Sequence, residues 1–240
     1  METVEDLQFK GLKLIQNDKV FRFGTDAVLL AAVCDVGAKD RVADLGTGSG
    51  IIPILLYGRT QAQVVGLEIQ SEAYELARRN VEINAAQDRV SMVQGDLRRA
   101  KELLPGRFTA VVCNPPYDKE GAGAGNRLDT HKNARLEALC CLDDVAAAAA
   151  SLLQTGGDFY MIHRAARLAE VMAACSKHRL EPKLLRLVAP RADREPGYML
   201  LKAKKDARPG MRILPTLLVE EEGGGYTAEM KKIYHQEEQQ

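Results

Sequence analysis

The sequence predicts an α/β fold: a doubly wound, mostly parallel sheet of seven strands, with helices on both faces and a terminal antiparallel strand pair. Two observations predict it. Short apolar runs that fit buried strands alternate with helical patterns along most of the chain. The last two predicted strands, 182–188 and 198–203, are separated only by 189–197, which leaves no room for a helix, so they should pair antiparallel.

The composition is that of a globular protein with one main domain. The chain has 240 residues, of which 46% are hydrophobic and 28% are charged, enough for a sizeable core. We expect residues 1–40 to form an N-terminal hairpin or flap and a capping helix, 41–206 the ligand-binding core, and 207–240 a C-terminal strand and polar tail packed on that core. Nothing in the sequence assigns an oligomeric state.

The expected compartment follows from the N-terminus, the hydropathy and the cysteines. The first residues are acidic and carry no apolar signal core, and no apolar run is long enough to span a bilayer. Five cysteines, an odd number lying mostly in apolar patterns, suggest reduced thiols. We therefore expect a cytoplasmic protein without membrane contact. Neither Cys-x-x-Cys nor His-x-x-x-His occurs, so no metal site is expected.

The most informative stretch is Asn114-Pro115-Pro116-Tyr117, directly after a predicted strand over 108–113. Two prolines cannot continue a strand ladder or enter a helix interior, so the chain is pinned as it leaves the sheet. The carboxamide and the neighbouring backbone carbonyl can accept both hydrogens of an NH2 group, and the tyrosine ring can stack on a flat molecule. These four residues are therefore candidate catalytic residues. The alternative is a turn that only ends the strand, with Tyr117 packed on the surface.

A second signal is the glycine-rich turn after the predicted strand 42–45. It has the pattern Asp-x-Gly-x-Gly-x-Gly, starting at Asp44, and leads into a helix over 51–57. Glycines let the backbone approach a ligand closely, but a carboxylate at the strand end suits a cationic amino group better than a pyrophosphate. The ligand contacts that we predict here, besides Asp44, are Gly46, Thr47, Gly48 and Gly50.

Two further strand ends carry acids. The strand over 63–69 ends in Glu68-Ile69, where doubly wound folds place an acid that binds ribose hydroxyls; the alternative is a solvated acid. The next strand, 90–93, is followed by Asp96-Leu97. The carboxylate of Asp96 can accept a hydrogen bond from an adenine amino group or cap the following helix, and both roles can hold together.

The segment Phe23-Gly24-Thr25-Asp26 precedes an apolar helix near the N-terminus. We expect Thr25 or Asp26 to cap that helix and the segment to line the ligand site. Phe23 equally fits an ordinary hydrophobic staple. Upstream, residues 7–19 alternate apolar and polar residues, which predicts a short hairpin with its turn at Asn17-Asp18.

Two stretches are candidates for contact with a larger partner. The glycine-rich loop 118–133 follows the candidate catalytic stretch, and we expect it to order on substrate binding; a plain connector is the alternative. The formal net charge is +0, but basic residues outnumber acids between 177 and 212, as on a surface that follows a phosphate backbone. A solvated face fits the same pattern. A lone histidine such as His163 is more often structural than chemical.

Together these motifs resemble those of the class I S-adenosyl-L-methionine-dependent methyltransferases. Asn-Pro-Pro-Tyr is similar to the signature of the members that methylate an amino or amide nitrogen. The stretches Phe21-Arg-Phe-Gly-Thr-Asp-Ala27 and Arg208-Pro-Gly-Met-Arg-Ile-Leu-Pro215 resemble the bacterial tRNA1(Val) adenine-N6 methyltransferase group, and the resemblance runs from about Leu7 to Tyr234. One position departs from that group: Leu136 stands where its members often carry a histidine.

The resemblance implies a Rossmann-like fold and direct methyl transfer from S-adenosyl-L-methionine to N6 of the adenine beside the valine anticodon of a tRNA. It implies that Asp44 and the glycine turn hold the methionine part of the cofactor, with Glu68 on the ribose and Asp96 on the adenine. The segment Phe23 to Asp26 would close over the cofactor, and Ile69, Leu97 and Asn114 would also contact it. The target adenine would leave its stack and lie against Tyr117, with its amino hydrogens accepted by Asn114 and the carbonyl of residue 115.

Three other functions compete with this one. One is a protein-glutamine N5-methyltransferase, which must activate an amide nitrogen and so needs the same Asn-Pro-Pro-Tyr chemistry. Such enzymes carry a larger N-terminal domain than the forty or so residues before Asp44 allow. Methylation of guanine N2 in ribosomal RNA is a second enzyme alternative. The third is a non-catalytic RNA-binding protein on the same scaffold, which would have no reason to keep the acids and the Asn-Pro-Pro-Tyr stretch together.

Overall fold

A computed structural model describes residues 1–17, 24–117 and 140–235. The chain begins with a two-stranded hairpin, β1 (Glu2–Asp6) and β2 (Lys13–Asn17), which pair antiparallel. The main sheet contains β3 (Arg41–Leu45), β4 (Gln63–Glu68), β5 (Val90–Gln94), β6 (Phe108–Cys113), β7 (Leu153–Arg164), β8 (Leu180–Ala189), β9 (Tyr198–Lys205), β10 (Arg212–Ile213) and β11 (Leu217–Leu218).

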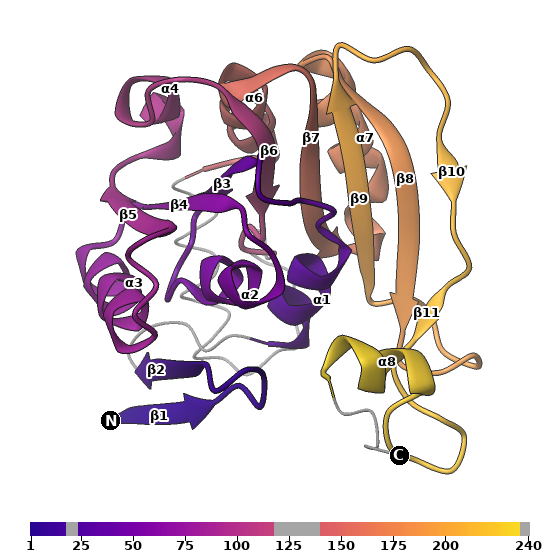
Figure 1. Cartoon of the computed structure of the whole chain (residues 1–240). Helices are drawn as coiled ribbons and strands as arrows, with labels where there is room; N and C mark the ends of the chain where they lie inside the picture. The colour runs from indigo at the N-terminus through magenta and orange to yellow at the C-terminus, as the bar shows by residue number, and fades with distance from the viewer. Residues whose placement is uncertain (18–23, 118–139, 236–240) are drawn as a thin grey trace.

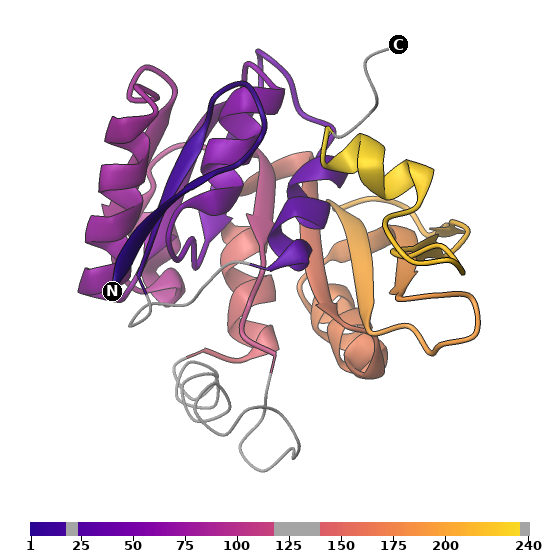
Figure 2. The ribbon, with the colours of Figure 1, turned by 90° about the horizontal axis from the view of Figure 1, so that it is seen from below.

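The helices follow the strands as expected for a doubly wound fold (Figure 1). They are α1 (Thr25–Val33), α2 (Ile51–Arg59), α3 (Ser71–Ile83), α4 (Ala100–Leu103), α6 (Leu142–Leu152), α7 (Leu168–Lys177) and α8 (Ala228–Ile233), with 3-10 turns η1 (Leu97–Arg99) and η2 (Ala165–Arg167). Seen from below, α1, α2, α3 and the hairpin lie on one side of the sheet, and α6 and α7 lie on the other (Figure 2).

The sheet order is β10-β8-β9-β7-β6-β3-β4-β5, with β11 also paired to β8. Strands β5, β4, β3, β6 and β7 are parallel, and β9 runs antiparallel to both β7 and β8, as predicted for the closing pair. The carboxyl ends of the parallel strands therefore meet at one edge, which we call the carboxyl edge. The order of the chain reverses between β3 and β6, and such folds bind their ligands at the carboxyl edge beside this reversal.

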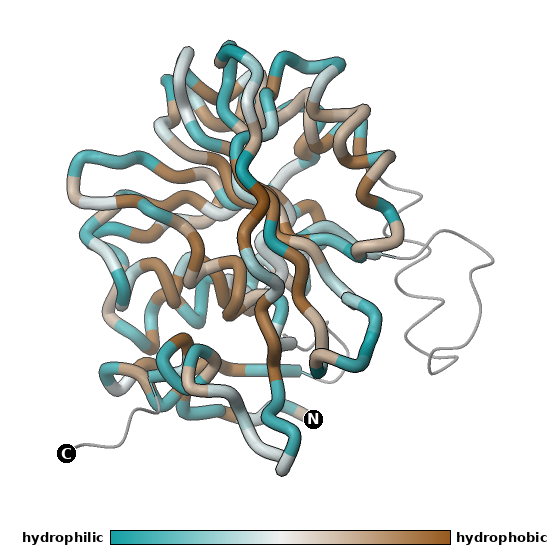
Figure 3. The backbone as a smooth tube through the Cα atoms, turned by 90° about the vertical axis from the view of Figure 1, so that its right-hand side faces the viewer, coloured by the Kyte–Doolittle hydropathy of each residue, from teal (hydrophilic) through white to brown (hydrophobic). Residues whose placement is uncertain are grey.

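Two hydrophobic cores cover the two faces of the sheet. Along β3 and β4, Val42 and Val64 face the core that contains α1 and α2, whereas the next residues, Ala43 and Val65, face the core that contains α6 and α7. This alternation is the two-residue period of a pleated strand. The central strands are accordingly hydrophobic along their length in Figure 3, while the connecting turns are more hydrophilic.

The seven predicted strands are all present, and the main sheet has nine strands because two very short ones, β10 and β11, extend its edge. We expected one further strand, within residues 207–240. The structure divides this region into β10 and β11, both parallel to β8. Pro215 lies between them and has no N–H for the ladder, which explains the interruption.

The predicted hairpin exists, but its turn is elsewhere. The chain reverses between Leu7 and Leu12, closed by a hydrogen bond from Leu7 N to Leu12 O of 2.9 Å, and not at Asn17, which belongs to β2. Gly11 has φ +72°, a left-handed conformation that favours glycine and makes this turn possible. No helix among the described residues is long and apolar enough to cross a membrane. The division at 40 and 206 stays a prediction.

Candidate active site at the carboxyl edge

Four consecutive strand ends carry the predicted site residues. Leu45 pairs with Cys113 across β3 and β6, and Glu68 pairs with Gln94 across β4 and β5. The residues that follow or end these strands, among them Asn114, Asp44, Glu68 and Asp96, therefore stand along one edge. Phe23 lies outside the described residues.

Asp44 is a fully buried carboxylate. Its side chain is 0% exposed, Thr47 Oγ1 donates to Oδ2 at 2.6 Å, and Oδ1 has no hydrogen-bond partner among the described residues. Burial, and to a lesser degree the charge of Glu68, raises the pKa of Asp44 from 3.8 to about 7, against the opposing effect of the Thr47 hydrogen bond. A buried acceptor without a partner is rare, and here it points to a ligand that brings a donor.

The glycine turn is tied to the next strand end. Gly46, Gly48 and Gly50 all have left-handed backbones, with φ of 72°, 57° and 81°. The amide of Gly48 donates to Glu68 Oε2 at 2.9 Å, while Glu68 Oε1 accepts from Gln70 N at 2.9 Å. Each carboxylate oxygen keeps acceptor capacity, so Glu68 can bind hydroxyl donors from a fixed position.

Asn114 and Tyr117 meet the start of α1. Asn114 Nδ2 donates to Asp26 Oδ2 at 3.0 Å, and the Tyr117 hydroxyl lies 2.5 Å from the same oxygen and also contacts Asn114 Oδ1. Neither Thr25 nor Asp26 caps α1, contrary to expectation: Gly24 occupies the cap position without a side-chain bond, and Asp26 is buried in the first turn. The reason is that its carboxylate is engaged with Asn114 and Tyr117.

Tyr117 is enclosed by aromatic and basic side chains. Its ring makes edge contacts with His163 and Tyr198, at centroid distances of 5.3 and 5.6 Å, and the Arg164 guanidinium lies 5.1 Å from its centre. His163 is 0% exposed, and burial lowers its pKa to about 4, so this ring is neutral near pH 7 and supports Tyr117. The stacking of a substrate base on Tyr117 stays a prediction.

Asp96 has the capping role that the sequence suggested. It accepts a hydrogen bond from Arg98 N at 2.9 Å at the start of η1, and the Arg98 side chain also pairs with it. The side-chain hydrogen bond from Arg98 lowers the pKa of Asp96. A role in binding adenine stays a prediction. Ile69 and Leu97 follow the neighbouring strand ends, with Ile69 39% exposed.

Two residues important for the site were missed from the sequence. Asn80 of α3 is fully buried, accepts from Ile15 N at 2.6 Å and donates to Ser49 O at 2.9 Å, so it joins the hairpin to the glycine turn. Gly66 in β4 leaves room for Thr47, because an added Cβ would lie 2.8 Å from Thr47 Oγ1. A glycine inside a strand often marks such a close approach, so the role of Gly66 could have been predicted from the sequence.

Comparison with known proteins places the chain in a family. The methyltransferase small domain model matches residues 15–178. A tRNA1(Val) (adenine(37)-N6)-methyltransferase of Porphyromonas gingivalis is 34% identical over 200 residues, covering 80% of this chain and 78% of the relative. One of the same name from Phocaeicola vulgatus is 29% identical and covers 82% of each chain. The chain belongs to the methyltransferase small domain family, with these tRNA1(Val) (adenine(37)-N6)-methyltransferases among its relatives.

Solved methyltransferase structures share the fold. A predicted O-methyltransferase of Agrobacterium tumefaciens, protein Atu636, superposes with a TM-score of 0.73 at 27% identity, covering 88% of this chain and 95% of that one. The M. jannaschii tRNA m1G37 methyltransferase superposes with a TM-score of 0.60 at 18% identity, covering 86% and 57%. The predicted Rossmann-like methyltransferase class is thus confirmed.

Several basic side chains in the C-terminal third of this methyltransferase form ion pairs with acids, some of which lie on earlier elements. The pairs include Lys177 with Asp143, Arg179 with Asp206, Arg186 with Glu229, and Lys202 and Lys204 with Asp158. Strand β9 runs away from the carboxyl edge, so its lysines lie toward the opposite end of the sheet. Arg164, by contrast, ends β7 at the carboxyl edge and is exposed. Loop 118–133 and Leu136 lie outside the described residues.

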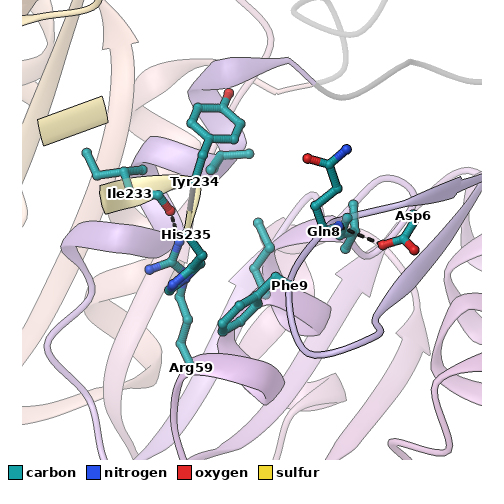
Figure 4. A pocket seen from close by; sticks show the side chains of 10 residues that line it. Asp6, Gln8, Phe9, Arg59, Ile233, Tyr234 and His235 are labelled. Carbon is teal, nitrogen blue, oxygen red and sulfur yellow. Dashed lines mark hydrogen bonds between the residues drawn. The ribbon is translucent and has the colours of Figure 1, made fainter. Parts of the chain in front are cut away.

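A separate cavity of about 190 Å³ lies between the hairpin turn and the end of α8 (Figure 4). None of the predicted site residues lines it. Phe9 stacks on His235 with ring centroids 3.9 Å apart, and Arg59 Nη2 donates to Ile233 O at 2.5 Å. The first contact joins the hairpin turn to the residues after α8, and the second joins the end of α2 to α8. No group of three or more His, Cys, Asp or Glu among the described residues could hold a metal ion.

Proposed function

We propose that this protein transfers a methyl group from S-adenosyl-L-methionine to N6 of adenine 37 in tRNA1(Val). The observation that carries the proposal is the Asn114 carboxamide, held at the end of β6 next to a glycine turn lined by two buried acids. The names of the relatives at 29–34% identity specify the tRNA and the base. The fold and the family identify S-adenosyl-L-methionine as the cofactor. A tRNA substrate fits a cytoplasmic localisation.

The residues at the carboxyl edge fit this cofactor. Asp44 Oδ1 is a buried acceptor without a partner among the described residues, which suits the ammonium group of the methionine part. Glu68, fixed by two backbone amides, would accept the ribose hydroxyls. Asp96 and Leu97 would border the adenine, and the left-handed glycines let the backbone come close. When bound, the cofactor supplies an electrophilic methyl group on a sulfonium.

Asn114 would orient the acceptor nitrogen. Its Oδ1 and the carbonyl of Pro115 accept the two hydrogens of the adenine amino group, which draws the nitrogen lone pair out of conjugation and aims it at the methyl group. This is catalysis by positioning and by preorganised polar groups, which can contribute several kcal/mol. A strong base is unnecessary before transfer, because the nitrogen becomes acidic only once it is methylated.

Substrate tRNA would approach the carboxyl edge. Arg164 at the end of β7 is exposed, and its guanidinium lies 4.7 Å from the ring centre of Tyr198, so the charge is held rigidly beside Tyr117. Loop 118–133 is the other proposed contact. The ion-paired lysines of β9 contribute less, because their charge is already compensated.

The test uses labelled S-adenosyl-L-methionine and total tRNA from a strain that lacks this modification. The expected product is N6-methyladenosine in valine tRNA. Label in a release-factor glutamine or in guanine of ribosomal RNA would contradict the proposal in favour of those alternatives, and no binding of S-adenosyl-L-methionine would favour a non-catalytic RNA-binding protein.

Asn114→Ala tests the assigned role. Transfer should fall by at least about 100-fold, because an acceptor aimed at the reacting group is lost. Affinity for S-adenosyl-L-methionine, measured by calorimetry, should change little. An equal loss of both would mean that Asn114 holds the cofactor and not the substrate.

A further inference from the structure

The side chain of Asp26 contacts two residues of the candidate catalytic stretch, Asn114 and Tyr117. It is the second residue of α1 and is 6% exposed, and the single oxygen Oδ2 contacts both Asn114 Nδ2, at 3.0 Å, and the Tyr117 hydroxyl, at 2.5 Å. The first turn of α1 is thereby bonded to the loop after β6, 88 residues further along the chain.

Gly24 makes this placement possible. An added Cβ at Gly24 would stand 2.7 Å from Asp26 Oδ1, closer than real Cβ atoms come to such an atom. The backbone of Gly24, with φ −115°, is one that any residue can adopt, so glycine is needed here for space and not for conformation. The Asp26 carboxylate therefore folds back over Gly24 to reach Asn114.

The hydrogen bond to Asp26 holds the Asn114 carboxamide in one orientation. An ionised carboxylate only accepts hydrogen bonds, so it holds the NH2 end of the amide and leaves Oδ1 pointing elsewhere. Oδ1 is in contact with the Tyr117 hydroxyl. That hydroxyl has one proton, and a charged acceptor competes for it better than a neutral amide oxygen does. When the proton is donated to Asp26, the lone pairs of Asn114 Oδ1 stay available.

We propose that Asp26 is a positioning residue for methyl transfer: it fixes the Asn114 amide with Oδ1 toward the substrate amino group and keeps the Tyr117 hydroxyl from donating to that oxygen. This inference rests on the proposed function of Asn114. It adds a role in methyl transfer to the ligand contact expected of the segment that contains Asp26. Burial, followed by the charge of Asp26, raises the pKa of Tyr117 well above its ordinary value, so the hydroxyl keeps its proton near pH 7.

Two single variants separate hydrogen bonding from packing. Asp26→Asn can still present one oxygen with two lone pairs to both donors, so kcat should stay within about tenfold of wild type. Asp26→Leu has similar size but no acceptor, so the amide is free to turn and the Tyr117 hydroxyl moves onto Asn114 Oδ1. Its kcat should fall by about 100-fold, as for other losses of alignment. Far-UV circular dichroism and urea unfolding of both variants show whether they are folded.

A double variant gives a readout that a merely structural role would not produce. Tyr117→Phe removes the competing hydroxyl, so adding it to Asp26→Leu should raise kcat above that of Asp26→Leu alone. The same change in the wild-type background should not raise kcat, because Asp26 already holds the hydroxyl. A structural role predicts instead that the double variant is at least as impaired as the worse single variant.

The outcomes separate this inference from the proposed function. The inference is overturned if wild type methylates tRNA and Asp26→Leu keeps its kcat, if Asp26→Asn is as impaired as Asp26→Leu, or if Tyr117→Phe gives no recovery. If wild type methylates a protein amide and not tRNA, the proposed function fails, and the same variants assayed on that amide still decide the role of Asp26.

Discussion

Replacing Asp44 by asparagine should change how the stability of the protein depends on pH. The carboxylate is fully buried, Oδ1 lacks a partner among the described residues, and burial raises its pKa from 3.8 to about 7. Below pH 3.8 the group is neutral in both the folded and the unfolded chain. Between pH 3.8 and 7 the unfolded chain loses the proton while the folded protein keeps it, so folding becomes less favourable as pH rises.

The size of the effect follows from the two pKa values. The free energy of unfolding falls by about 1.4 kcal/mol for each pH unit between them, because the states differ by one bound proton. From pH 5 to 7 the wild type therefore loses about 2 kcal/mol through Asp44, because the folded carboxyl is already half ionised at pH 7, and the loss levels off above pH 8. Asp44→Asn has no proton to lose and removes this slope, whatever constant cost the buried amide adds.

Urea unfolding of both proteins at pH 5, 6, 7 and 8 measures the effect. The stability of Asp44→Asn relative to wild type should increase by about 2 kcal/mol between pH 5 and 7 and then level off toward pH 8. Affinity for S-adenosyl-L-methionine should fall in the variant, since the charge that would meet the ammonium group is gone.

Asp143→Asn is the matched control. Hydrogen bonds from Lys177 and then His178 lower the pKa of Asp143, so this carboxylate is already ionised in both states over most of the range, and its removal should add no such slope. A constant stability difference between wild type and Asp44→Asn from pH 5 to 8 would refute the reasoning, because it would mean that Asp44 ionises at its ordinary pKa in the folded protein.

Two further predictions concern the glycine turn and the substrate side. Gly50→Ala should lower the free energy of unfolding by about 1–3 kcal/mol in urea titrations, because φ is +81° and the new Cβ would lie 3.2 Å from Ala77 Cβ; an unchanged stability would contradict this. Arg164→Ala should raise KM for tRNA without changing affinity for S-adenosyl-L-methionine, whereas Arg179→Ala, an exposed arginine paired with Asp206, should change neither; equal effects of the two would reject a specific role for Arg164.

Most of the sheet and its site edge could be predicted because their signals are local. The strand predicted over 42–45 is β3, and the stretch before Asn114 is β6, with the prolines ending it as expected. Apolar runs, left-handed glycines and prolines each act on their own segment, and parallel strands necessarily bring their carboxyl ends to one edge. The placement of Asp44, Glu68 and Asn114 near one another followed from that topology alone.

The sequence by itself determined the α/β class, the strand ends and the residue types of the site. Only the tertiary structure decided what those residues touch. Asp26 looked like a helix cap and instead binds Asn114, Asn80 joins the hairpin to the glycine turn, and Lys204 of the basic third forms an ion pair with Asp158 of β7. The physical reason is that a side-chain hydrogen bond or ion pair depends on distances of a few ångströms between segments far apart in the chain, which no local pattern of residues encodes.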